Sequence, residues 1–122
     1  MSLTYSEMPD APVFEIAVEG HVSTAEFDEI ALRIEALIAR HGSVRMVEVV
    51  DRFPGFDPGL IAKGIAFDMR NIRHISHCAV VTDSAWIGTV TRMVSAVIPT
   101  TLRVFATSEP EAARAWARDP AG

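Results

Sequence analysis

The segment from Val44 to Pro58 constrains the fold more than any other part of the chain. It begins with a nearly continuous apolar run, Val44 to Val50, and then changes to charged side chains and an aromatic loop that contains proline and glycine. Such a run is typical of an interior parallel strand that is covered on both faces. Asp57 and Pro58 then supply an N-cap and a first-turn residue for a helix. The segment therefore predicts a buried strand followed by a helix, as in an α/β protein.

Strand and helix patterns alternate along the rest of the chain. Alternating apolar residues on both sides of residues 9–12 predict an antiparallel pair of strands at the start. Ser23 and Glu26 have the spacing of a capping box and Gly42 that of a helix C-cap, which together predict a helix over residues 24–41. The further expected elements are a helix that reaches about residue 70, a strand over 75–82, a helix over 84–98 capped by Asp83 or Ser84, and a strand over 101–106.

The last predicted helix follows a second capping-box pattern, formed by Ser108 and Glu111. Ala112, Ala113 and Trp116 give this helix a face of small residues that can pack closely. The complete order is ββαβαβαβα. It predicts a mixed sheet of about five strands, the first one antiparallel, with about four helices packed on it through right-handed crossovers.

Composition predicts one domain over residues 1–122, with residues 118–122 as a disordered tail. The formal charge of -5 is spread along the chain and provides no basic stripe, which argues against nucleic-acid binding. Cys78 is the single cysteine, so neither a disulfide framework nor a thiolate metal site is available. No apolar stretch approaches the roughly 18 residues of a membrane span. These features predict a cytoplasmic protein without stable membrane insertion.

Short motifs along the chain resemble those of a known family. They are Glu19-Gly20 before a capped helix, His41-Gly42 before an apolar strand, Phe53 and Gly55 in a loop, Asp83 and Trp86 after the next strand, and Phe105 with Ala113 and Trp116 at the end. In this order, and over nearly the whole chain, the pattern is similar to the SpoIIAA-like family. The resemblance implies a fold like that of STAS domains of anti-sigma-factor antagonists and of lipid-binding CRAL-TRIO domains. Most members of the family have no assigned activity.

The chain departs from the regulatory STAS proteins at one position. In phospho-switched antagonists an Asp-Ser pair begins the helix after the central strand, where a helix N-terminus favours an added phosphate. The corresponding pair here is Asp57-Pro58, and proline has no hydroxyl group. A switch of that kind would have to use Ser84 or Ser108, although a serine before a helix is usually only a cap.

A candidate site follows from the strand ends. If the strands before Asp51 and Asp83 are parallel neighbours, their carboxyl ends lie within about 5 Å laterally, at an edge where α/β proteins commonly bind ligands. We expect the residues at this edge to form the rim of a site that binds a small apolar or amphipathic, lipid-like molecule or a regulatory protein. Its expected members are Asp51, Arg52, Phe53, Phe56, Asp57, Asp83, Ser84 and Trp86. A purely structural alternative stays open, in which Asp51 pairs with Arg52 or caps a turn, Asp83 only caps its helix, and the aromatic residues close the end of the core.

Enzymatic and metal-binding alternatives have less support. The chain contains no nucleophile elbow, phosphate loop or dinucleotide fingerprint, so no catalytic residue or cofactor is assigned. A small hydrolase that uses the carboxylates of Asp51 and Asp83 is the alternative function. His74 and His77 are three residues apart and point to opposite faces of a strand, so no metal site is assigned to them.

Self-association is a further expectation. The predicted helix over residues 84–98 has apolar residues on more than one face, which is more than a single contact with the sheet requires. Trp86, Val90, Met93 and Val97 lie on one face, and Ile87, Val94 and Ile98 on another. This pattern predicts a homodimer.

Overall fold

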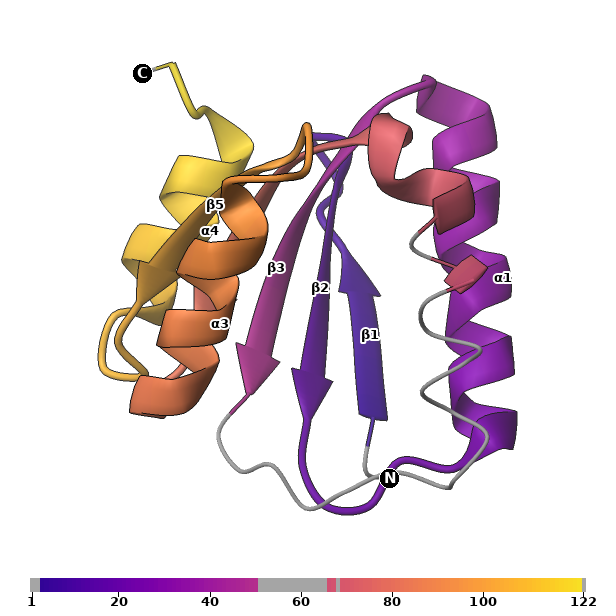
Figure 1. The fold of residues 1–122 in the computed structure, drawn as a ribbon. Helices are drawn as coiled ribbons and strands as arrows, with labels where there is room; N and C mark the ends of the chain where they lie inside the picture. The colour runs from indigo at the N-terminus through magenta and orange to yellow at the C-terminus, as the bar shows by residue number, and fades with distance from the viewer. Residues whose placement is uncertain (1–2, 51–65, 68, 122) are drawn as a thin grey trace.

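Five strands form the sheet in the computed structural model, which describes residues 3–50, 66–67 and 69–121 (Figure 1). The strands lie in the order of the sequence, and β1 is antiparallel to β2 while all the following neighbours are parallel. Their bounds are β1 Leu3–Glu7, β2 Val13–Val18, β3 Val44–Val50, β4 Ile75–Val81 and β5 Thr101–Phe105. The predicted mixed sheet with one antiparallel strand is confirmed.

Helices cover both faces of this sheet. The described ones are α1 Thr24–His41, the short 3-10 helix η1 Ile72–His74, α3 Ala85–Ser95 and α4 Pro110–Arg118, and residues 66–67 and 69–71 are also helical. The helix α1 packs on β1 and β3, α4 packs on β3, β4 and β5, and α3 contacts β5. In Figure 1, α1 lies on one side of the strands and α4 on the other. None of the helices among the described residues is long and apolar enough to cross a membrane.

The hydrophobic core consists of two clusters, one on each face of the sheet. Alternate residues of a strand point to opposite faces, and in β2 this sends Phe14 toward α1 and Val13 toward α4. The cluster on the α1 side includes the helix residues Ile30, Ile34, Leu37 and Ile38. The cluster on the α4 side joins Val13, Val47, Ala79, Val81 and Phe105 to Ala113 and Ala117. The strand β3 is therefore covered on both faces, as its continuous apolar run predicts.

Local signals set both ends of α1. The Ser23 side chain accepts a hydrogen bond from the backbone N–H of Glu26, and the Glu26 side chain accepts one from the backbone of Ser23, which completes the capping box. At the other end Gly42 has φ +78° and its N–H donates to the carbonyl of Ile38 at 2.7 Å. The predicted bounds of this helix, 24–41, are confirmed.

The expected capping box at the start of α4 is wrong. The helix begins at Pro110 with Glu109 as its N-cap, and no side chain caps it. Proline is favoured at the first helical position because its φ is already helical and it has no N–H to leave unpaired, so it sets the start two residues after Ser108. The carboxylate of Glu111 contacts Arg114 instead. The buried small residues of α4 are Ala113 and Ala117, whereas Ala112 is exposed.

Candidate functional site

The carboxyl ends of four parallel strands reach the same edge of the sheet. The pairs Val18–Val50, Val49–Val81 and Val81–Phe105 place the ends of β2, β3, β4 and β5 at a common level. We call this the carboxyl edge. The strands β3 and β4 both end there, which is the arrangement that the candidate site requires.

Two members of the predicted rim can be located with their side chains. Asp83 and Ser84 lie between β4 and α3, at the carboxyl edge, and Trp86 is the second residue of α3. The other predicted members, which are Asp51, Arg52, Phe53, Phe56 and Asp57, lie outside the described residues. The site as a whole remains a prediction.

Asp83 binds the neighbouring loop at the carboxyl edge. One carboxylate oxygen accepts a hydrogen bond from the backbone N–H of Thr107 at 3.0 Å, and the other accepts one from the Thr107 hydroxyl. The Thr107 hydroxyl, followed by its N–H, lowers the pKa of Asp83 because both bonds favour the ionised carboxylate. The side chain of Asp83 therefore joins the β4–α3 loop to the β5–α4 loop.

Thr82 and Ser84 complete the turn from β4 into α3. Thr82 is buried, and its N–H extends the β4–β5 pairing by donating to the carbonyl of Phe105 at 2.9 Å. Its hydroxyl accepts a hydrogen bond from the N–H of Ser84 at 3.1 Å. Ser84 is the N-cap of α3, but its side chain makes no capping hydrogen bond. The Thr82 hydroxyl and the Asp83 carboxylate thus hold the backbone of this turn, while the Ser84 hydroxyl takes no part in capping.

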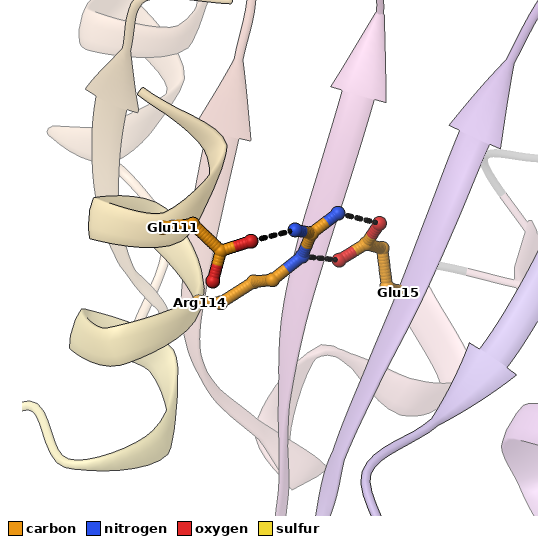
Figure 2. Close-up of polar contacts among 3 residues, drawn as sticks. All are labelled: Glu15, Glu111 and Arg114. Carbon is orange, nitrogen blue, oxygen red and sulfur yellow. Dashed lines mark hydrogen bonds and ion pairs between the residues drawn. The ribbon is translucent and has the colours of Figure 1, made fainter. Parts of the chain in front are cut away.

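A charged cluster on the α4 face of the sheet was not predicted from the sequence. Figure 2 shows the guanidinium group of Arg114 held by both oxygens of Glu15, at 2.7 and 2.9 Å, and in contact with Glu111. Glu15 is a charged residue inside an otherwise apolar strand, which is the signal that could have indicated a buried partner. The partner itself is 99 positions away, and no local spacing identifies it. The cluster therefore links α4 to β2, with β3 lying between them in the sheet.

A hollow of about 570 Å³ lies at the opposite edge of the sheet, between the β1–β2 loop and the end of α1. Three of its charged side chains, Glu7, Asp10 and Arg40, are paired within the chain. Glu7 accepts hydrogen bonds from the Tyr5 hydroxyl at 2.6 Å and from Arg40 at 3.0 Å, and Asp10 forms an ion pair with Arg118 at 3.6 Å. These contacts account for the two acidic side chains and the arginine of the hollow without a ligand.

The two histidines near the start of β4 have different surroundings. His74 Nδ1 lies 3.2 Å from the carbonyl oxygen of Gly42, in the loop that follows α1. His77 contacts the hydroxyl of Ser76 and lies edge-on to the ring of Trp116. Over the described ranges no group of three or more histidine, cysteine or acidic side chains is arranged to hold a metal ion.

Comparison with known proteins identifies the family. The SpoIIAA-like family model matches residues 13–118, and the chain therefore belongs to the SpoIIAA-like family. A similar solved structure is that of an uncharacterized protein with a SpoIIAA-like fold from Shewanella loihica PV-4, with a TM-score of 0.76 and 11% sequence identity over 94% of this chain and 91% of that chain. This likeness confirms the fold. No curated protein matches the chain.

Proposed function

We propose that the protein is a non-catalytic binding module that takes a small apolar or amphipathic molecule, or a regulatory protein, at the carboxyl edge of its sheet. The observation that carries the proposal is the pairing of Val49 with Val81, which brings the ends of β3 and β4 to one level. Phe53 and Phe56 follow β3 in the sequence, and Trp86 follows β4. Aromatic walls with a few polar groups are the usual form of a small-molecule site.

The contacts of Asp83 support binding over proton transfer. A general acid or base needs a carboxylate oxygen that can exchange a proton with a substrate. Both oxygens of Asp83 accept hydrogen bonds from Thr107, and these bonds lower its pKa. A carboxylate held in this way is a fixed acceptor, which suits the support of a binding rim better than hydrolysis.

A fluorescent amphipathic acid, 11-dansylaminoundecanoate, tests the ligand arm of this proposal. We expect a saturable increase in its emission with the purified protein, and loss of most of that increase in Phe53→Ala/Phe56→Ala and in Trp86→Ala. Leu32→Ala is the matched control because Leu32 is 69% exposed on α1, on a different element from the rim. Native mass spectrometry of the purified protein gives a second readout, a retained small molecule that the same rim variants lose.

The protein arm is tested by photo-crosslinking from position 53 in cells. A defined adduct that Trp86→Ala abolishes would support a partner at the edge. Unchanged dansyl emission in all rim variants, together with no retained molecule and no adduct, would contradict both arms.

A further inference from the structure

The geometry of α3 points to a symmetric homodimer in which one apolar patch meets its own copy. The patch consists of Val90, Met93 and Val94 on α3 and Val97 in the turn that follows, and we call it the α3 patch. Their exposed fractions are 46%, 69%, 39% and 80%, so all four side chains face solvent in the single chain. A contiguous apolar patch of this kind commonly marks an interaction surface.

Part of the apolar surface of α3 is turned away from the sheet. Helices on a sheet usually bury their apolar face and expose their polar face. In α3 the covered side carries Gly88, which is buried, with Ile87, Thr91 and Ser95, which are half-buried. The Thr91 hydroxyl donates to the carbonyl of Ile87 at 2.8 Å, so it is satisfied within the helix. Met93 and Val97 thus stay mostly exposed, and Val90 and Val94 are only partly covered.

The spacing of the α3 patch fits another helix with the same pattern. Its residues follow the i, i+3, i+4, i+7 order, which forms a continuous ridge along one side of a helix. In an antiparallel pair with a two-fold axis between Met93 and Val94, Val90 of one copy lies opposite Val97 of the other. A second copy therefore supplies the complementary ridge, as an isologous contact requires.

Charge also favours a second copy at this surface. A symmetric contact places each charge near its own equivalent, so a face that meets itself has to be free of unpaired like charges. All 16 acidic residues of this chain lie outside residues 84–108, although the formal charge of the whole is -5. Arg92 is exposed, and its guanidinium group lies near Gly88, which is not part of the α3 patch.

The exposed Leu32 of α1 provides the contrast. It has Asp28, Glu29 and Glu35 within one helical turn, and a symmetric contact there would bring carboxylates together. Of these two exposed apolar sites, only the α3 patch combines a continuous ridge with freedom from negative charge.

The size of the patch sets the expected strength. Eleven residues make α3 about 16 Å long. This is short for an interface of about 800 Å² per partner, even with the adjoining edge strand β5. We therefore expect a dimer that dissociates on dilution.

Analytical ultracentrifugation of the full chain over about 1 µM to 1 mM tests the dimer. We expect the weight-average mass to rise from one copy toward two, and the variant Met93→Glu/Val97→Glu to raise the dissociation constant at least about tenfold. Leu32→Glu is the matched control, since Leu32 and Met93 are both 69% exposed. It should leave the dissociation constant within about twofold. Unchanged far-UV circular dichroism in both variants would show that each one folds.

Site-directed crosslinking gives an independent readout. Cys78 is the single cysteine and is buried, so a cysteine at position 93 reports its own position alone. We expect Met93→Cys to form a disulfide-linked dimer under mild oxidation and Leu32→Cys to stay monomeric. A monomer at every concentration, or a dimer that persists in Met93→Glu/Val97→Glu, would overturn the inference. Neither of these results tests the proposed binding at the carboxyl edge, because that proposal is tested by ligand fluorescence, a retained molecule and a crosslinked partner.

Discussion

Arg114 is the residue through which the last helix reaches the other half of the sheet. Its bond to Glu15 joins α4 to β2 across β3, and this bond is the main cause that raises the pKa of Arg114 above its usual range. The side chain of Glu15 is only 20% exposed, whereas that of Glu111 is 84% exposed. The two carboxylates therefore contribute unequally to stability. Water screens the exposed pair with Glu111, whereas removing Arg114 leaves the mostly covered carboxylate of Glu15 without a partner.

We predict that Arg114→Ala lowers the free energy of unfolding by about 1–3 kcal/mol, since it leaves the carboxylate of Glu15 without its partner. Glu111→Ala should cost less than about 0.5 kcal/mol, as expected for an exposed pair. Urea unfolding followed by circular dichroism measures both values. Equal losses in the two variants would show that the bidentate contact with Glu15 has no special weight.

Asp83 gives a prediction for pH dependence. Its folded-state pKa is lowered by Thr107, so the stabilisation is present above the unfolded pKa of about 3.9 and is lost as the pH falls through the folded value. Asp83→Asn should therefore lower the melting temperature at pH 7 and lower it less at about pH 2, because the stabilisation is lost as the carboxylate is protonated. Thermal unfolding at the two pH values, with the exposed Asp119→Asn as control, checks this. A deficit of the same size at both values would argue against the ionised carboxylate as its cause.

At the scale of elements, substitution by alanine should change stability in opposite directions at Gly42 and Gly88. Gly42 has φ +78° and an added Cβ there would meet nothing within 4 Å, so Gly42→Ala should cost about 1 kcal/mol from backbone strain alone. Gly88 is inside α3, and an added Cβ would meet only the Arg92 side chain, at 3.6 Å. Gly88→Ala should stabilise by about 0.5–1 kcal/mol through helix propensity. Chemical denaturation of both variants checks the signs, and destabilisation by Gly88→Ala would indicate a closer approach to the sheet.

The helices show which elements a sequence can predict. Every signal of α1 is local, from the Ser23–Glu26 capping box to Gly42, and its bounds were predicted correctly. The start of α4 was predicted wrongly because two local signals competed, and Pro110 outweighed the serine. The orientation of α3 could not be predicted, since periodicity reveals that a helix has an apolar face and not what that face meets.

For the whole molecule, the same reasoning separates the fold from the site. The mixed sheet with one antiparallel strand followed from the alternation of strands and helices and from right-handed connections, which are strong physical constraints on a chain of this size. The Glu15–Arg114 pair depends on two residues brought together only by the finished fold. At the carboxyl edge the sequence predicted the positions of Asp83 and Ser84, but the bond from Asp83 to Thr107 again depends on two loops that tertiary structure places side by side.

The shared sheet makes a prediction about cooperativity. Phe14 and Val13 are neighbours in β2 and belong to the cores on opposite faces, so neither core can be lost without exposing strands that the other one needs. Ile34→Ala, in the core on the α1 side, should cost about 2–5 kcal/mol. The chain should still unfold in a single transition, and this transition should move to lower denaturant concentration.

Trp116 reports on the opposite side, because its ring packs near Phe105 and His77. In a Trp86→Phe background, we expect the Trp116 fluorescence and the far-UV circular dichroism of Ile34→Ala to give the same shifted denaturation midpoint. The control Ala113→Leu overpacks the other core. It should lower the free energy of unfolding by about 1–3 kcal/mol, with the same value from both signals. A Trp116 transition that stayed at its original midpoint in Ile34→Ala would show that the two faces unfold separately, and the sheet would then not couple them.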